Sequence, residues 1–383
     1  MHSSISRKRQ LLNKINKIYY ITYQTFPAET ANSLQTISNI KHILKLGMNV
    51  HLIFPLREQR SSDDVAIINS FYEEDLHFDI TGTDHKYPFG KFKLFNRLLF
   101  LMSHFLWSRK TVANILEKKD NSIGFFTRSD WVFYFLSKNN KNVVFECHQF
   151  TKIRKFIISS SLKNPGSKII FLNENLKNDY EKRFKLNNNF VILQNGVDES
   201  LFENTSKNNN QIIFVGKLTR FGKSRNIDYL INSFSQLNDS YKLKIIGATE
   251  PEREKYQKIV GELKIDRRVK IFEFMSHRKV VKHILESEIG VLINTIDNAH
   301  STKYTSPLKY FEYLYADVKV IASNFEAHKK LPFSENIKFF NIGDSSSFVK
   351  SVIEVQDTPT LDKNKKEKIS LDLRAKEILN LFN

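Results

Sequence analysis

One stretch of the sequence combines an anion-binding helix start with a nearby carboxylate, Lys303-Tyr-Thr-Ser-Pro-Leu-Lys-Tyr-Phe-Glu312. Thr305 and Ser306 are residue types that cap helix N-termini, and Pro307 suits the first helical position because its missing N–H is not needed there. The free N–H groups at such a start carry roughly half a positive charge and attract anions. Glu312 can accept two hydrogen bonds from a vicinal diol such as a ribose.

The elements that must position these groups are a helix and a strand. Leu308, Phe311, Leu314 and Tyr315 recur at spacings of three and four, which predicts an amphipathic helix with one buried side. The apolar run at 318–322 that follows predicts a buried strand.

The segments 306–314 and 318–323 together resemble the nucleotide-sugar signature of retaining GT-B glycosyltransferases, especially family 4. The resemblance implies that Glu312 holds the donor ribose. The family has two glutamates here, of which Glu312 matches the second. Tyr304 stands at the position of the first, which contacts the donor sugar, and Asp317 stands where the family has a glycine after the helix. The implied fold is α/β, with two Rossmann-like parallel-sheet domains that face a central crevice.

Cations follow the predicted strand 211–216, which ends in Gly216. They neutralise charge where a diphosphate leaves a sugar. The resemblance gives Lys217 the first of two diphosphate contacts. Equal spacing favours Lys223 for the second, whereas alignment of the following Asn-Ile-Asp-Tyr-Leu favours Arg225. A basic loop on a basic protein is the alternative interpretation.

The resemblance therefore implies a donor site in the second half of the chain. The strand 269–272 matches a base-binding strand, so Phe272 is expected to line the base pocket. The expected donor-binding residues are Gly216, Lys217, Lys223, Arg225, Phe272, Tyr304, Thr305, Ser306, Pro307, Leu308 and Glu312.

In the first half, the strand 143–147 and the residue after it contain Glu146-Cys-His148. This motif resembles a strand of the family that ends in a glutamate, one further residue and a histidine. His148 is expected near the reacting centre, and Glu146 either orients it or simply ends the strand. The segment 31–35 resembles the acceptor-side helix start, so Asn32 and Ser33 are candidate acceptor contacts. Ser33 can equally be the helix cap.

The catalytic candidates are His148, Lys217, Lys223 and Glu312. The resemblance implies that the transfer retains the anomeric configuration. The sequence shows no carboxylate pair for a double displacement, so we expect a front-face mechanism in which the departing diphosphate takes the acceptor proton. The sequence has no Asp-x-Asp and no His/Cys cluster with metal-ligand spacing. We therefore expect a metal-independent enzyme of the hexosyltransferase type without a cofactor.

Chain length and turn signals predict two domains. A chain of 383 residues can bury two cores. The turn 194–198 resembles the one that closes the first domain in this family, and 203–210 suits a linker. We expect an acceptor domain over 1–205, a donor domain over 206–365, and a C-terminal helix over 366–383 that crosses back to the first domain.

The composition limits the cellular compartment and the kinds of partner that fit the protein. A single cysteine, Cys147, fits a reducing compartment, and neither an export signal nor a spanning segment is apparent. The net charge of +18 favours a polyanionic partner, although a basic surface without one is the plain alternative. The segment Lys86–Lys110 interleaves cations with aromatics. It fits an anionic membrane surface, the core of a helix pair or, less well, single-stranded nucleic acid.

We thus expect a cytoplasmic transferase that moves a sugar from a nucleotide-sugar to a glycan or lipid-linked acceptor. Peripheral attachment to the inner membrane face is an open alternative to a fully cytoplasmic location. Surface polysaccharide or lipopolysaccharide-type biosynthesis is the commonest setting of its relatives. Two rivals stay open at this point. One is a non-hydrolysing sugar-nucleotide epimerase of the same fold, and the other is a catalytically silent basic scaffold or nucleic-acid binder.

Overall fold

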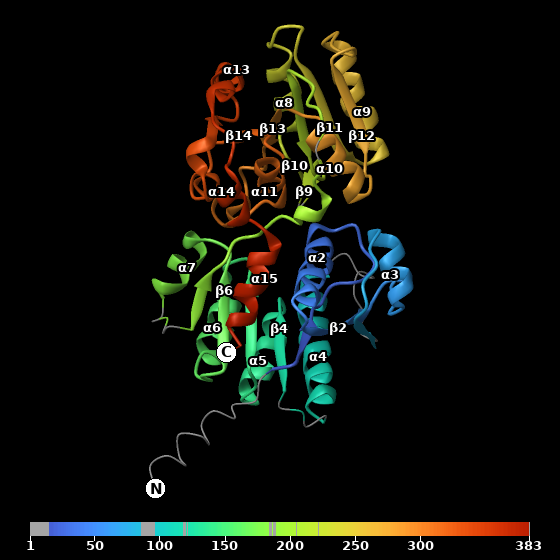
Figure 1. The fold of residues 1–383 in the computed structure, drawn as a ribbon, viewed down its shortest axis with the longest axis vertical. Coiled ribbons are helices and arrows are strands. Elements are labelled where there is room, and N and C mark those ends of the chain that lie inside the picture. The colour runs from blue at the N-terminus through green and yellow to red at the C-terminus, as the bar shows by residue number, and fades with distance from the viewer. Residues whose placement is uncertain are drawn as a thin grey trace. The chain divides into compact units, whose positions relative to one another are not determined.

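The computed structural model describes residues 15–85, 96–117, 120, 122–183, 186, 189–203, 205–220 and 222–382. The chain divides into two compact units (Figure 1). The first contains Met1–Phe171, Lys177–Leu193 and Arg374–Asn383, and the second contains Leu172–Leu176 and Gln194–Leu373. The proposed limits at residues 205 and 365 stay predictions.

The first unit is built on a parallel sheet. Within the described residues its strand order is β3-β2-β1-β4-β5-β6-β7. The strands are β1 (Lys17–Ile21), β2 (Asn49–Leu56), β3 (Asp79–Asp84), β4 (Ile123–Thr127), β5 (Val143–Cys147), β6 (Ser167–Phe171) and β7 (Phe190–Ile192). Because β1 pairs with both β2 and β4, the strand order reverses there. Ligands of open parallel sheets bind beyond the carboxyl ends at such a reversal.

Helices cover both faces of this sheet. They are α2 (Ala31–Lys45), α3 (Val65–Tyr72), α4 (Asn96–Leu116), α5 (Asp130–Lys138), α6 (Lys152–Ser161), α7 (Glu174–Glu181) and α15 (Leu371–Asn380). The helices α2 and α15 lie over one face (Figure 1). Tyr20, Val144 and Ile170 belong to the core on that side, together with residues of these two helices. Side chains alternate along a strand, so Phe145 points to the other face, where Phe133 of α5 stacks on it at 5.0 Å.

The second unit repeats this plan. In the part of the chain that is described, its main sheet is parallel with order β12-β11-β8-β13-β14-β15, and β9 and β10 form a small antiparallel ladder. The strands are β8 (Gln211–Val215), β9 (Thr219–Arg220), β10 (Lys223–Ser224), β11 (Lys242–Ala248), β12 (Val269–Glu273), β13 (Ile289–Leu292), β14 (Lys319–Ser323) and β15 (Ile337–Phe340). Here the order reverses at β8, between β11 and β13.

The helices of the second unit flank this sheet. They are α8 (Ile227–Phe234), α9 (Glu250–Glu262), α10 (His277–Leu285), α11 (Leu308–Tyr315), α12 (Glu326–Lys329), α13 (Ser345–Glu354) and α14 (Lys363–Glu367), with short helical turns η2 (Glu199–Leu201), η3 (His300–Tyr304), η4 (Ser334–Asn336) and η5 (Val355–Asp357). The predicted α/β class with two parallel-sheet domains is therefore confirmed.

The predicted helix and strand around residues 308–323 are α11 and β14. Asp317 takes the left-handed conformation, with φ of 55°, and its carboxylate accepts a hydrogen bond from Lys366 at 2.7 Å. Aspartate tolerates this conformation better than most residues. The turn that the family makes with glycine is thus retained with a different residue.

The structure tests the basic aromatic segment Lys86–Lys110 only in part. Residues 86–95, with Lys91 and Lys93, lie outside the described residues, and the rest belongs to α4. Trp107 is only 1% exposed and donates a hydrogen bond to Thr83 at 2.7 Å, so it is a core aromatic. No helix in the described ranges is long and apolar enough to cross a membrane.

Close approach of α11 to the sheet depends on Gly290 of β13. A Cβ added at Gly290 would lie 2.4 Å from Cδ2 of Tyr313, whose side chain is fully buried. Replacing Gly290 by alanine is therefore expected to displace α11 and to lower the free energy of unfolding by about 1–3 kcal/mol. Urea unfolding followed by circular dichroism measures this change.

Gly261→Ala is the matched control. Gly261 lies in α9, and the nearest atom to its added Cβ is 3.6 Å away. Because glycine destabilises a helix by about 0.5–1 kcal/mol relative to alanine, this variant should be as stable as the wild type or more so. An unfolding midpoint for Gly290→Ala equal to that of the wild type would contradict the proposed packing role.

Candidate functional site

The start of α11 differs from the prediction by one residue. Pro307 is the N-cap residue rather than the first helical residue, and Leu308 begins the helix. Ser306 does not cap it, because its Oγ accepts a hydrogen bond from the Asn195 N–H at 3.3 Å and its carbonyl accepts one from the Asn195 side chain at 2.6 Å. Among the described residues, no side chain caps α11. Its first N–H groups are therefore available to an anion.

Glu312 is held rigidly in its ionised form. It is 4% exposed, its Oε1 accepts a hydrogen bond from His277 Nε2 at 2.9 Å, and its Oε2 accepts one from Lys309 at 2.8 Å. Burial alone would raise its pKa, but the charges and hydrogen bonds of Lys309 and His277 outweigh burial and lower it to about 2. Each oxygen keeps a further lone pair for a ligand hydroxyl.

The cations after β8 have different surroundings. Lys217 is exposed, and Lys223 is an exposed surface residue whose ammonium lies 2.9 Å from Asp297. Arg225 instead lies against the end of β8, where a Cβ added at Gly216 would be 2.7 Å from its Nη1. Glycine at 216, with φ of 147°, therefore makes room for this guanidinium.

Arg225 is a partly buried cation without a carboxylate partner among the described residues. Its Nε is buried without a hydrogen-bond partner, and within the described part of the chain no carboxylate forms an ion pair with it. Burial, followed by the like charge of Arg220, lowers the pKa of Arg225 to about 10. A cation that is partly removed from water without a partner gains stability when an anion joins it. This arrangement fits an anionic ligand at the carboxyl end of β8.

Other predicted donor contacts lie nearby in the same unit. Tyr304 ends η3 and is buried, as is Thr305 directly after it. Phe272 is half-buried in β12 and packs on His283 of α10, with the ring centres 5.3 Å apart. Phe274, just beyond β12, is 51% exposed and offers a free ring face. Because β13 pairs with β8, the loop leading to α11 and the loop after Gly216 leave neighbouring strand ends.

In the first unit, Glu146 is the centre of a buried charge cluster. Its Oε2 accepts a hydrogen bond from Arg374 at 2.6 Å, and its Oε1 accepts one from His148 Nε2 at 2.5 Å. Arg128 lies 3.4 Å from the same carboxylate. Complete burial acts to raise the pKa of Glu146. The charges of Arg374 and Arg128 and the hydrogen bond from His148 outweigh burial and hold this pKa well below its usual value.

His148 is oriented by this cluster. Its Nε2 contacts Glu146, and Arg128 Nη2 lies 3.2 Å from its Nδ1 and 2.6 Å from its Nε2. Both ring nitrogens are thus engaged inside the unit. Glu146 does orient His148, so it is more than the last polar residue of a strand.

The two acceptor candidates have different roles. Asn32 is exposed, and both its side-chain oxygen, at 3.0 Å, and its carbonyl, at 3.3 Å, accept hydrogen bonds from Arg128. Arg128 therefore brings Asn32 and His148 together. Ser33 is buried, and its N–H donates to Thr30, the actual N-cap of α2. The interpretation of Ser33 as the cap is wrong.

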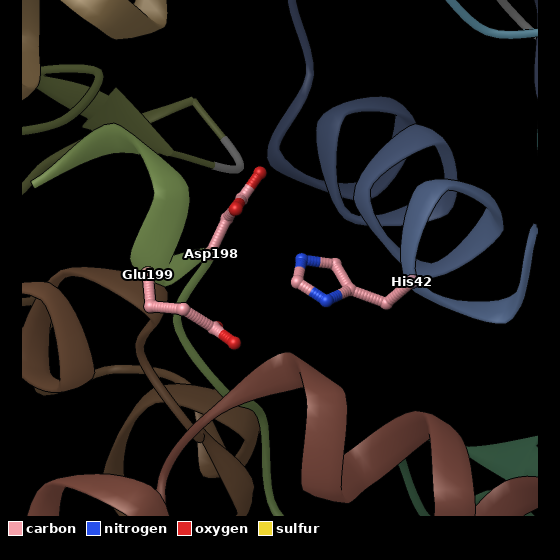
Figure 2. A group of neighbouring side chains, drawn as sticks. All are labelled: His42, Asp198 and Glu199. Atoms are coloured by element: carbon pink, nitrogen blue, oxygen red, sulfur yellow. The ribbon is translucent and has the colours of Figure 1, made fainter. Parts of the chain in front are cut away.

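Figure 2 labels three residues whose side chains are of types that can bind metals. They are His42 on α2, and Asp198 and Glu199 at the start of η2. His42 belongs to the first unit and the two carboxylates belong to the second. Asp198 already accepts hydrogen bonds from the Ser200 N–H at 3.2 Å and the Ser200 hydroxyl at 2.6 Å. We assign no metal site to them.

Sequence reasoning missed Arg128, His277 and Arg374. Arg128 directly follows β4 at the strand-order reversal, so its position was a usable signal. His277 follows the strand expected to hold the base, but nothing in its spacing links it to Glu312. Arg374 is 228 residues from Glu146, and only the fold brings them together.

The Arg374–Glu146 pair should be important for stability. Arg374→Met keeps most of the apolar stem but leaves Glu146 without one of its charged donors. We expect the free energy of unfolding to fall by about 3–5 kcal/mol, because breaking a buried ion pair leaves the remaining charge buried without its partner. Chemical denaturation measures the effect. Lys376→Met, at an exposed position of the same helix, is the control. Equal stability of the two variants would contradict the assignment.

Ionised Glu312 should stabilise the second unit in a pH-dependent way. Its folded-state pKa of about 2 lies below the usual 4.5, so its contribution is complete above pH 4.5 and is lost as pH falls towards 2. Glu312→Gln should therefore unfold at a lower temperature than the wild type at neutral pH, and the difference should shrink only in acid. Glu254→Gln, exposed on α9, is the control. A difference that is constant down to pH 2 would count against this account.

A protein-family model and several solved structures match this chain. Residues 197–366 match the model of the family described as glycosyl transferases group 1. Sucrose-phosphate synthase (tll1590) from Thermosynechococcus elongatus is similar in structure, with a TM-score of 0.71, 15% identity, and coverage of 96% of this chain and 98% of that chain. No curated protein matches the sequence significantly.

Two further structures are similar. Alr3699/HepE of Anabaena, in complex with UDP, has a TM-score of 0.65 and 12% identity over 95% of this chain and 98% of its own. The lipopolysaccharide outer core galactosyltransferase WaaB has a TM-score of 0.62 and 15% identity over 95% of this chain and 99% of its own. The chain therefore has the GT-B fold, and its residues 197–366 match the family model of glycosyl transferases group 1.

Proposed function

We propose that the protein is a retaining glycosyltransferase of the family 4 type. It transfers a hexose from a nucleoside diphosphate sugar, bound by the second unit, to a glycan or lipid-linked glycan bound by the first. The observation that carries this proposal is the Arg225 guanidinium, which is partly buried at the end of β8 and has no carboxylate partner in the described part of the chain. A diphosphate supplies the missing negative charge.

The donor diphosphate is bound between two groups of the second unit. Arg225 and Lys217 follow β8, and the uncapped N–H groups of α11 follow β13, the adjacent strand. Helix N-termini and guanidinium groups are the usual ligands of phosphate oxygens. Lys223 contributes less, since it is exposed and paired with Asp297. This favours Arg225 over Lys223 as the second diphosphate cation.

The nucleoside is held further into α11. His277 and Lys309 fix the Glu312 carboxylate, so its remaining lone pairs can accept hydrogen bonds from both ribose hydroxyls without reorganisation. Phe274 and Phe272 flank the end of β12, where the base binds. UDP is the first donor class to test, because the similar Anabaena structure contains it.

The chemistry follows from the positions of these charges. As the bond between the sugar C1 and the phosphate oxygen breaks, negative charge grows on the diphosphate and is stabilised by Arg225, Lys217 and the α11 amides. The acceptor oxygen bonds to C1 on the same face, and its proton passes to the departing phosphate oxygen. These cations supply the positive charge that the step needs, which supports a metal-independent reaction.

The acceptor binds to the first unit beyond β1, β4 and β5. Asn32, Arg128 and His148 lie there as one hydrogen-bonded group. Because Glu146 and Arg128 engage both nitrogens of His148, we assign it a binding and orienting role rather than that of a proton acceptor. A polysaccharide or lipopolysaccharide-type acceptor is supported by the similarity to WaaB.

Nucleotide binding tests the proposal. We expect one of UDP, GDP, ADP and CMP to raise the unfolding temperature selectively. Arg225→Gln should weaken that binding about tenfold to a hundredfold, since a hydrogen bond between charged groups contributes about 1.5–3 kcal/mol. Isothermal titration calorimetry measures both dissociation constants.

Lys223→Gln separates the two candidate cations and should bind nearly as well as the wild type. A large loss in Lys223→Gln with none in Arg225→Gln would reverse the assignment. If no nucleotide binds the wild type, the enzyme proposal is wrong. If the donor sugar is instead converted to its epimer without an acceptor, the epimerase of this fold is the better description.

A further inference from the structure

The helices α4, α5 and α6 form a neighbouring row over one face of the first unit's sheet. α5 packs between the other two, and its Phe133 contacts the sheet through Phe145. The opposite sides of the three helices are directed away from the sheet. We call this outer surface the α4–α6 face.

The α4–α6 face exposes large apolar side chains. Leu98, Met102 and Leu106 follow one another at four-residue spacing along α4 and are 56%, 52% and 37% exposed. On α6, Ile153 and Phe156 are 44% and 62% exposed. Isolated exposed apolar residues are ordinary, but a group on adjacent helices marks an interaction surface.

Half-buried aromatic rings lie between these two groups. Phe105 of α4 contacts Trp131 and Phe135 of α5, with ring centres 4.8 and 5.4 Å apart. Tyr134 lies beside Trp131 at 5.9 Å. Trp and Tyr are enriched where a protein meets the interface of a bilayer, because their rings are apolar at one end and polar at the other.

The charges of the α4–α6 face all have one sign. The sequences of α4 and α6 contain no Asp or Glu, and the single acid of α5, Asp130, is buried and paired with Arg154 at 3.0 Å. Cations on the outer sides of the three helices are Arg109, Lys110, Lys138, Lys152 and Lys155. The ammonium of Lys138 lies 5.6 Å from the centre of the Tyr134 ring.

We propose that the α4–α6 face binds the surface of an anionic lipid bilayer. The apolar side chains enter the boundary between headgroups and acyl chains, the Trp and Tyr rings lie at headgroup level, and the cations pair with anionic headgroups. This interaction goes beyond sugar transfer and is independent of the donor site. It also brings the acceptor-binding unit to a surface where lipid-linked glycans reside.

Two other occupants fit the face less well. A nucleic acid could stack bases on Phe156, but it would leave the aliphatic side chains of Leu98, Met102 and Ile153 without an apolar partner. A second copy of the chain would bring the same uncompensated cations together, on a protein whose net charge is already +18. A bilayer satisfies the apolar side chains and the cations at once.

Vesicle co-sedimentation of the full chain tests the proposal. We expect binding to vesicles of phosphatidylcholine with phosphatidylglycerol, and much weaker binding to phosphatidylcholine alone. Each cation near an anionic surface contributes about fivefold to binding, so Arg109→Gln/Lys110→Gln/Lys152→Gln should weaken it about a hundredfold. Added salt should weaken the binding of the wild type.

A matched charge control has the same net charge. It combines Lys350→Gln, Lys363→Gln and Lys376→Gln, and these three lysines are exposed outside the α4–α6 face. This control variant should bind vesicles as the wild type does, apart from a small effect of net charge. Equal losses in the two triple variants would show a general charge effect and overturn the proposal.

An apolar variant tests insertion. Met102→Ser/Phe156→Ser should weaken vesicle binding at least tenfold, whereas Ile353→Ser, 58% exposed on α13, should not. Both substitutions of the variant are at exposed positions, so we expect the variant to fold. Unchanged stabilisation by nucleotide would confirm that it is folded. Binding that is insensitive to Met102→Ser/Phe156→Ser would overturn the proposal. So would a dimer of the wild type that this variant dissociates, or tight binding to RNA without binding to vesicles.

Tryptophan fluorescence gives a second readout. The chain has two tryptophans, and Trp107 is buried, so a blue shift on adding vesicles should come from Trp131. Trp131→Phe should remove the shift while vesicle binding is largely kept. Vesicle binding without any shift in the wild type would contradict the placement of Trp131 in the interface.

Discussion

The proposed donor site depends on the positive charge of Arg225 at the end of β8, which has no anionic partner among the described residues. Its guanidinium lies against Gly216, its Nε has no hydrogen-bond partner among the residues that the structure describes, and Arg220 adds a like charge nearby. A charge removed from water in this way is unfavourable by itself. In the proposed reaction a diphosphate supplies the opposite charge, and Arg225 then stabilises the diphosphate as it leaves.

Both units place a buried carboxylate near the ligand edge of a parallel sheet and hold it with cations and a histidine. Glu312 is fixed by Lys309 and His277, and Glu146 is fixed by Arg374, Arg128 and His148. Each carboxylate is therefore ionised and rigid before any ligand arrives, so binding requires little reorganisation. The two have different tasks, because Glu312 can still accept from ligand hydroxyls, whereas Glu146 is fully buried and acts through His148.

Much of the fold and part of the site could be predicted from the sequence. Apolar runs and helical periodicity identified the two parallel-sheet domains, α11 and β14, because such patterns depend on local spacing. The start of α11 was placed one residue early, since Ser306 bonds to Asn195 from a distant turn instead of capping the helix. Arg374 and His277 were missed because their partners are distant in sequence. Spacing alone could not choose between Lys223 and Arg225, which differ in burial and in pairing with Asp297.

The most direct test of the central claim is a crystal structure of the protein grown with a saturating nucleoside diphosphate. The account predicts phosphate oxygens within hydrogen-bond distance, about 3 Å, of the Arg225 guanidinium and of the first N–H groups of α11, with the ribose hydroxyls on Glu312. A diphosphate bound elsewhere, or an Arg225 side chain directed away from it, would contradict the account.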